Sequence, residues 1–244
     1  MNRSLFRWIA LALVAVAGAA LAYVFLAGGS GEPSTDLTTP TIASETTLGN
    51  EAGSASTSST GPVGVVAFVI DAEQSEASFQ IDEVLRGSPN AVVGTTSQVA
   101  GQIQFDPADL SNLEFSQIVI NARTFDTGSG LRDRAIRGPI ILNSAQDEFE
   151  LIILDSASAN GLNGQASPGD ALSFTVTGDL TIQSTTNSVT FDVVAELVDP
   201  RTIRGTAEAI VSRAEFRIGI PNVPTVADVS DDVLIRLDFV ATSG

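Results

Sequence analysis

Hydrophobic and polar residues alternate along most of the chain beyond Val65. A period of two places successive side chains on opposite faces of an extended strand, so the pattern predicts strands with one apolar and one solvated face. We count about eight such strands, which together predict an antiparallel sheet folded on itself as a barrel or a sandwich. The clearest alternating runs are Ala77-Phe79-Ile81, Gly101-Ile103-Phe105, Ile118-Ile120-Ala122, Val189-Phe191-Val193-Ala195-Leu197 and Val233-Ile235-Leu237-Phe239.

Short groups of turn-forming residues separate these runs, as expected for connections between strands. They are Asp106-Pro107, Asn160-Gly161, Ser167-Pro168-Gly169 and Asp199-Pro200. Residues 130–137 are instead charged and do not alternate, and Gly138-Pro139 follows them. We expect a short helix or an ordered loop there. Its charges would form either a solvated face or a lid over one mouth of a barrel.

An uncharged hydrophobic run occupies residues 8–27. As a helix it would be about 30 Å long, which is the thickness of the hydrocarbon core of a bilayer. Arg3 and Arg7 precede the run, and Glu32 and Asp36 follow it. By the positive-inside rule, residues 1–27 are predicted to form a transmembrane helix that anchors the chain, with the rest outside the cytoplasm, either periplasmic or extracellular.

The same region also fits a cleaved signal peptide, because Ala20-Leu21-Ala22 has the small-x-small pattern of a cleavage site. In that case the domain would be secreted. Residues 28–64 are rich in glycine, serine and threonine and poor in large apolar residues, so they are predicted to be a flexible tether. The folded domain would then comprise residues 65–244.

The composition excludes several kinds of site. The chain has no histidine and no cysteine, and its 12 basic residues are all arginines. Zinc centres, serine–histidine nucleophiles and disulfides are therefore excluded. With 29 acidic residues the net charge is -17, which repels phosphate backbones, so we expect no nucleic-acid partner.

Paired carboxylates are the remaining route to catalysis, and their spacing does not support one. Asp147-Glu148 and Asp231-Asp232 are sequence neighbours, which places the two carboxylates on opposite faces of a strand or in a loop. We therefore predict that the chain is not an enzyme and has no cofactor and no metal site.

A series of short motifs follows one order along residues 66–241, and each motif is weak when taken alone. They are Phe68-Val69-Ile70-Asp71, Ser78-Phe79-Gln80-Ile81, Gly94 and Gly101, Ile103-Gln104-Phe105-Asp106-Pro107, Thr127, Arg132-Asp133, Gly178-Asp179-Leu180-Thr181-Ile182, Arg213-Ala214-Glu215-Phe216 and Val229-Ser230-Asp231-Asp232-Val233. The ordered set resembles the YceI-like family of polyisoprenoid-binding proteins. Glu83 and Ala135 stand where that family usually carries histidines.

The resemblance implies an eight-stranded antiparallel, lipocalin-like barrel whose apolar interior takes an extended isoprenoid chain, such as a quinone tail or a polyprenyl lipid. The chain would carry or store that lipid at the outer side of the membrane. Periodicity alone leaves the interior open, because eight strands enclose a space that side chains can fill or that one slender ligand can occupy. With a filled barrel, the domain would be an extracytoplasmic interaction module instead. A homodimer is also left open.

The inward apolar side chains are predicted to contact the lipid, with core packing as the alternative for each of them. Arg132, with Asp133, would place a lipid head group or close the mouth, or else these two residues would pair with each other or with strand ends. The predicted apolar contacts are Phe79, Ile81, Ile103, Phe105, Ile118, Ile120, Phe174, Val176, Phe191, Val193, Ile235 and Leu237.

Overall fold

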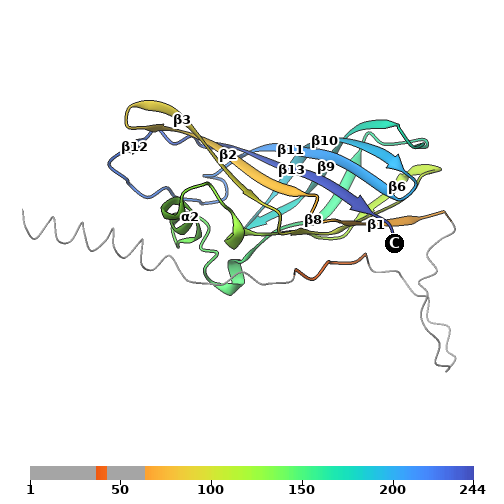
Figure 1. Ribbon diagram of the computed structural model, residues 1–244, viewed down its shortest axis with the longest axis horizontal. Helices are drawn as coiled ribbons and strands as arrows, with labels where there is room; N and C mark the ends of the chain where they lie inside the picture. Colours follow the sequence, from red (N-terminus) through yellow and green to blue (C-terminus); the bar gives the residue numbers. More distant parts are fainter. Residues whose placement is uncertain (1–36, 43–63) are drawn as a thin grey trace, which may run out of the picture.

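A closed antiparallel β-barrel forms the body of the computed structural model, which describes residues 37–42 and 64–244. Val69 and Ile70 of the first strand pair with Thr242 and Ala241 of the last, which closes the ring and confirms the predicted eight-stranded barrel (Figure 1). In spatial order the ring consists of β1 (Val66–Ile70), β5 (Gln102–Asp106), β6 (Asp109–Phe115), β8 (Leu151–Asn160), β9 (Ala171–Ile182), β10 (Thr185–Asp199), β11 (Thr202–Ser212) and β13 (Asp232–Thr242).

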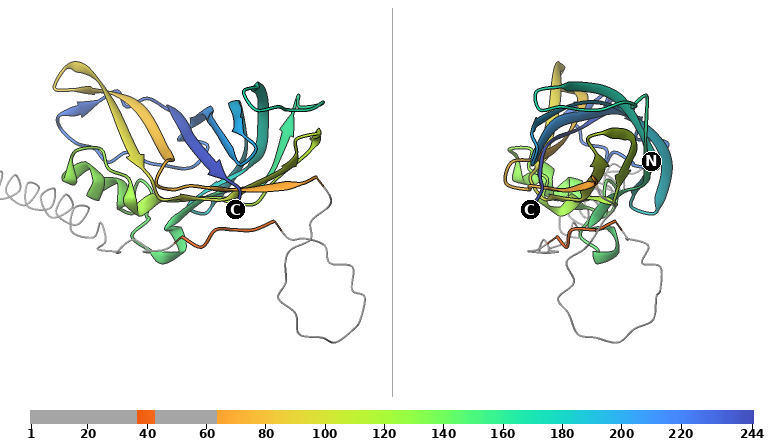
Figure 2. Two further views of the ribbon diagram at one scale, coloured as in Figure 1. Left: turned by 45° about the vertical axis from the view of Figure 1, so that its right-hand side comes forward. Right: turned by 90° about the vertical axis from the view of Figure 1, so that its right-hand side faces the viewer.

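The remaining strands extend the wall at one end of this ring. β2 (Glu76–Leu85) pairs with β13 and forms a hairpin with β3 (Ser88–Thr96), while the short β12 (Val226–Ala227) pairs with the end of β2. β7 (Ile118–Asn121) pairs with β8 and with the two-residue β4 (Val99–Ala100). The view along the barrel in Figure 2 shows the strands arranged around a common axis.

A crossover connects β7 to β8 and contains the only helices among the described residues. These are the 3-10 turns η1 (Ala122–Thr124) and η2 (Asp147–Phe149) and the helix α2 (Gly130–Arg137), so of the two predicted alternatives, a short helix or an ordered loop, the structure has the helix. In Figure 1, α2, β12 and the β2–β3 turn all lie at the left end of the molecule, opposite the start of β1 and the carboxyl terminus. We call this end of the barrel the mouth.

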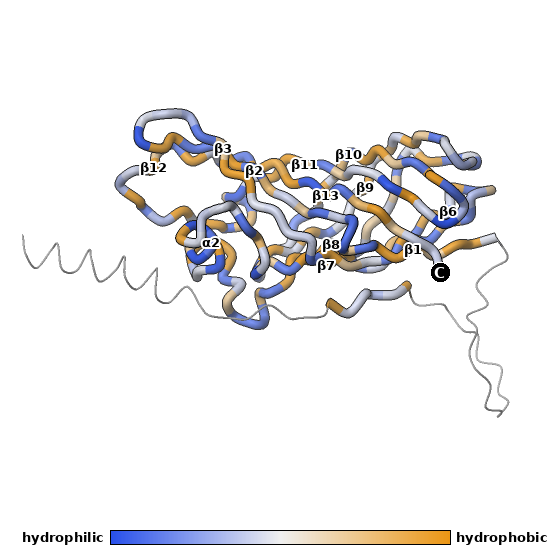
Figure 3. Tube along the Cα trace, viewed as in Figure 1, coloured by the Kyte–Doolittle hydropathy of each residue, from blue (hydrophilic) through white to orange (hydrophobic). Residues whose placement is uncertain are grey.

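Apolar side chains form two clusters, one toward each end of the barrel. The first is centred on Phe68 and Phe105, whose rings stack with centroids 5.1 Å apart. The second lies below the crossover and the turn after β11, where Phe125, Ile136 and Phe216 are buried. Apolar and polar residues alternate along the strands between them, as the colours in Figure 3 show.

Two glycines of the sequence motifs are required by close packing. A Cβ atom on Gly94 would lie 2.4 Å from Cε1 of Phe79, and one on Gly101 would lie 2.4 Å from Cδ1 of Ile118. Real Cβ atoms do not approach carbon this closely, so a side chain at either position would force its neighbour to move. Both neighbours are among the inward residues predicted from the alternation.

Residues 37–42, from within the predicted tether, lie against the outside of the barrel. We call them the strap. The backbone N–H of Ile42 donates to Oε1 of Gln102 at 2.9 Å. Leu37, Thr38 and Pro40 border a space with the outward-facing Val119, Leu151 and Ile153 of β7 and β8. The strap therefore covers an apolar patch on the outer face of the wall.

The predicted anchor, residues 1–27, lies outside the described residues, as does most of the predicted tether. Among residues 37–42 and 64–244, no helix has both the length and the apolar character that crossing a bilayer would take.

Candidate ligand-binding cavity

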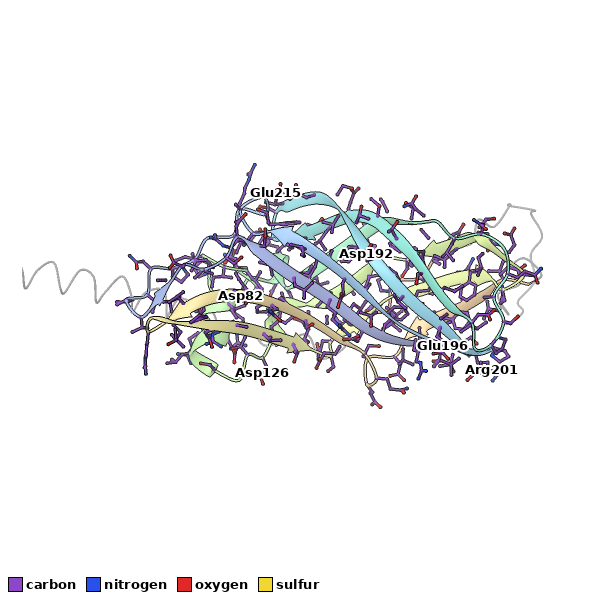
Figure 4. All side chains as sticks on the ribbon, turned by 90° about the horizontal axis from the view of Figure 1, so that it is seen from above. Asp82, Asp126, Asp192, Glu196, Arg201 and Glu215 are labelled. Carbon is purple, nitrogen blue, oxygen red and sulfur yellow. The ribbon has the colours of Figure 1, made fainter. Side chains whose placement is uncertain are left out.

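The barrel interior contains an apolar cavity of about 650 Å³. Its wall is built from the inward side chains of most strands, because alternation places every second residue of a strand on the same face. Many outward strand positions carry polar or charged groups, as at Asp192 of β10 in Figure 4. The cavity has the size of pockets that bury small ligands, which are typically about 300–1,000 Å³.

All thirteen side chains predicted to contact a ligand lie in the wall of this cavity. Whether they touch a ligand stays a prediction. They are Phe79, Ile81, Ile103, Phe105, Ile118, Ile120, Phe174, Val176, Phe191, Val193, Ile235, Leu237 and Arg132.

The wall also contains strand residues that the predicted set omitted. Leu172, Ala195 and Phe239 belong to the same alternating rows as predicted members of their strands, so the sequence pattern already contained them. Leu113 and Phe115 add a further row from β6, which follows the turn at Asp106-Pro107. The alternation therefore identifies a larger part of the wall than the motifs alone suggested.

The loop between β11 and β12 provides wall residues that no periodic pattern could reveal. Ile218, Ile220, Pro221 and Val223 reach the cavity from this loop. They belong to no strand or helix, so their burial depends on where the rest of the chain places the loop.

Arg213 holds this loop in place. Its guanidinium donates to the carbonyl oxygens of Ser230 at 2.9 Å, Ile218 at 3.3 Å and Val229 at 3.5 Å. Asp231 accepts from the Ser212 hydroxyl and from the Ala214 backbone N–H, and the Ser212 hydrogen bond holds the pKa of the Asp231 carboxyl below its usual value. The two sequence motifs at 213–216 and 229–233 thus tie the loop to the barrel at the mouth.

A buried polar network fastens the crossover to the barrel. Arg123 donates to Glu150 Oε2 at 3.0 Å and to the carbonyl oxygens of Ser144 and Ala145. Asn121 donates to the other oxygen of Glu150 at 2.8 Å. Buried charges persist in proteins when they are paired and hydrogen-bonded in this way. The network fixes the two ends of the segment that carries α2.

Arg132 and Asp133 do not pair with each other. The Asp133 carboxylate is buried and accepts from the backbone N–H of Thr127 at 3.0 Å and from its hydroxyl at 2.6 Å. Asp133 is therefore structural, because it joins the start of α2 to the preceding loop. Arg132 lies in the cavity wall, and its guanidinium makes no hydrogen bond or ion pair with any residue that the structure describes.

The charged side chains of the wall fall into two groups. Glu196 and Arg236 are engaged elsewhere: Glu196 pairs with Arg204, and Arg236 pairs with acidic groups on β11 and β13. The others, which are Glu83, Arg86, Arg132 and Arg213, lie at the mouth. Glu83 and Ala135, the positions where the YceI-like pattern usually has histidine, both reach the cavity there.

Nothing in the described ranges resembles a metal centre, because no three His, Cys, Asp or Glu side chains come together to hold an ion.

Comparison with known proteins supports the fold and identifies a family. A family model described as "YceI-like domain" matches residues 68–241. The structure of BcnA from Burkholderia cenocepacia has a TM-score of 0.54 and 22% identity, covering 71% of this chain and 99% of that one. A polyisoprenoid binding domain from Saccharophagus degradans, implicated in plant cell wall breakdown, has a TM-score of 0.58 and 12% identity, covering 73% and 99%. No curated protein matches the chain.

Proposed function

The chain belongs to the YceI-like domain family, and we propose that its barrel binds one isoprenoid-type lipid, a quinone tail or a polyprenyl chain. One of the structures it resembles is described as a polyisoprenoid binding domain, which supports this choice of ligand. The proposal extends to carrying or storing the lipid at the outer side of a membrane.

The apolar cavity inside the barrel is the observation that carries the proposal. Protein interiors are packed as densely as organic crystals, with few voids larger than a water molecule. A space of about 650 Å³ walled by phenylalanine, isoleucine, leucine and valine departs from that rule. Such a space is expected where an apolar ligand completes the packing.

The alternative of a filled barrel acting as an interaction module is less favoured by the same observation. A module of that kind needs no internal space, and its inward side chains would be expected to close the interior to normal density. The side chains here leave the cavity open although they include eight phenylalanines: Phe79, Phe105, Phe115, Phe125, Phe174, Phe191, Phe216 and Phe239.

Binding requires only that the hydrocarbon chain of the lipid be buried in the cavity, and no covalent bond is formed. Each methylene buried from water contributes about 0.8 kcal/mol, but a lipid taken from a bilayer leaves a hydrocarbon environment and most of that gain cancels. The affinity must therefore come from contact between the lipid and the cavity wall. The branched and aromatic side chains of the wall provide many van der Waals contacts for a slender lipid chain.

The position of the strap supports placing the mouth toward the membrane. Ile42 lies beside Gln102 of β5, which pairs with Val69 of β1, whereas Leu37 and Thr38 border a space with Asp147 and Glu150 of the crossover. The strap therefore runs along the barrel from the β1 side toward the crossover (Figure 2). We propose that the predicted anchor, which precedes Leu37 in the chain, reaches the domain from that side.

The test compares two substitutions at neighbouring positions of β10. Val193 points into the cavity and is 5% exposed, whereas Val194 points outward and is 56% exposed. The full-length chain, purified in a mild detergent, is incubated with a prenyl-chain quinone, and the quinone that co-elutes with the protein is quantified. We expect Val193→Trp to abolish most of this quinone by filling the cavity, and Val194→Trp to leave it unchanged.

The detergent micelle is the same for both variants, so quinone dissolved in the micelle cannot produce a difference between them. Equal quinone with both variants, each still folded by circular dichroism, would contradict binding in the barrel.

A further inference from the structure

The charged side chains that line the cavity at the mouth differ in sign from the protein as a whole. The chain has 29 acidic and 12 basic residues. Among the side chains that line the cavity at this end, three are arginines, Arg86, Arg132 and Arg213, and one is acidic, Glu83. Because a lipid chain buried in the apolar interior leaves its polar end at the opening, these are the groups that would face a head group.

The partners of these four residues decide which charges are available. The Arg213 guanidinium donates hydrogen bonds to three backbone carbonyls. These neutral acceptors fix the position of the guanidinium and leave its positive charge unpaired with any of them. Glu83 accepts from the Asn90 side-chain amide at 3.0 Å. The guanidinium groups of Arg86 and Arg132 have no hydrogen-bond or ion-pair partner among the described residues, although each lies in the cavity wall.

From this arrangement we infer that the bound lipid has an anionic head group, a phosphate or a carboxylate, held at the mouth by Arg132 and Arg86. Arginine presents several N–H donors in a planar fork that matches both of these anions. The inference rests on the proposed function, because it concerns the polar end of the same lipid. It predicts that an acidic amphiphile binds more tightly than a neutral lipid, such as a quinone, that has the same kind of chain.

Arg132 is better placed than Arg86 to bind the head group. It lies on α2, which the Thr127–Asp133 hydrogen bonds join to the preceding loop, and it is half-buried. Arg86 lies at the β2–β3 turn and is exposed. A charge-assisted hydrogen bond is stronger where solvent is partly excluded, so Arg132 is expected to contribute more to head-group binding.

The experiment is a competition between two ligands that share one chain. The full-length protein in mild detergent receives equal amounts of geranylgeraniol and geranylgeranyl phosphate, and native mass spectrometry measures the ratio of the two adducts. We expect the phosphate to be preferred by about tenfold, the scale of one charge-assisted hydrogen bond. A parallel pair, oleyl alcohol and oleate, shows whether a carboxylate on an unbranched chain gives the same preference.

A matched set of variants assigns the effect to the mouth. Arg132→Gln should lower the amount of bound phosphate much more than the amount of bound alcohol and so remove most of the preference, and Arg86→Gln should reduce the preference less. Arg134→Gln is the control, because Arg134 lies on the same helix and is exposed but is not part of the cavity wall. The guanidinium of Arg132 has no hydrogen-bond or ion-pair partner among the described residues, so the variant should also melt at the wild-type temperature.

Two outcomes would overturn the inference while leaving the proposed function intact. One is equal binding of alcohol and phosphate by the unmodified protein. The other is an equal loss of preference in Arg134→Gln and Arg132→Gln, which would mean that net charge alone is responsible. Failure of every ligand to bind would contradict the proposed function itself, and the head-group inference with it.

Discussion

Arg123 Nη1 donates a 3.0 Å hydrogen bond to Glu150 Oε2, and both side chains are almost fully buried. This pair connects the beginning of the crossover to its end, so the position of α2 over the mouth depends on it. Breaking a buried ion pair by removing one partner typically costs about 3–5 kcal/mol, and the other acidic partner of Arg123, Asp147, is exposed to solvent.

We therefore expect Glu150→Gln to lower the free energy of unfolding by about that amount, measured by chemical denaturation. The control is Asp147→Asn, because Asp147 also pairs with Arg123 but its side chain is 97% exposed. Exposed ion pairs contribute little. If both variants lost the same stability, the buried pair would not be the main fastening of the crossover.

Replacing Gly94 with alanine tests the close packing beneath the mouth. The new Cβ would lie 2.4 Å from the Phe79 ring, so the ring must move toward the cavity. We expect Gly94→Ala to destabilise the protein by about 1–3 kcal/mol and to reduce lipid binding. Gly130→Ala is the matched control, since no atom lies within 4 Å of its Cβ position and alanine favours a helix. A stable Gly94→Ala protein that binds lipid normally would contradict the packing argument.

The ion pairs on the outer face of β13 predict a dependence of stability on pH. Hydrogen bonds from Arg236, at 2.6 and 2.7 Å, lower the pKa of the Asp238 carboxyl. A lowered folded-state pKa means that this stabilisation is present above about pH 3.9, the unfolded value, and is lost as the pH falls through the folded-state value.

Asp238→Asn should therefore melt below the wild type at neutral pH, and the difference should shrink as the pH falls below about 3.9. The effect should be small, because the Asp238 side chain is 44% exposed and solvent screens the pair. Thermal denaturation across this range measures it. A melting difference that stays constant down to the acid transition would show that the lowered pKa is not its source.

Exchange of the Ile42 amide proton tests the strap. This N–H donates to the Gln102 side chain, so we expect slow exchange in the wild type and faster exchange in Gln102→Leu, measured by hydrogen exchange with mass spectrometry. Gln104→Leu serves as the control, because Gln104 lies two residues further along β5 and has no such contact with the strap. Equally fast exchange in the wild type and both variants would show that the strap does not stay on the barrel.

The strands and their inward faces could be predicted from the sequence because each strand has one wet face. At Phe79 and Ile81, for example, the polar neighbours Ser78 and Gln80 fix which side chains point inward. The helix at residues 130–137 could be predicted for the opposite reason, since its charges do not alternate. Local pattern and final structure agree wherever one surface faces water and the other does not.

The strap and the loop between β11 and β12 could not be predicted in this way. The composition of residues 28–64 as a whole indicated a tether. It gave no sign that Leu37 and Pro40, within this polar stretch, would lie against apolar side chains on the outside of the barrel. One signal was present: Leu151-Ile152-Ile153-Leu154 is apolar without alternation, which indicates that both faces of that strand are covered. Arg123 and Glu150 gave no signal at all, because their pairing depends on how the crossover returns to the barrel.

Native mass spectrometry of the full-length chain as purified, from a host rich in isoprenoids, tests the central claim most directly. We predict a stoichiometric non-covalent adduct that survives in the wild type, is missing from Val193→Trp, and yields a prenyl-chain lipid on extraction. The account would be contradicted if the spectrum showed only the mass of the protein without an adduct, both as purified and after incubation with prenyl quinones, prenyl alcohols and prenyl phosphates.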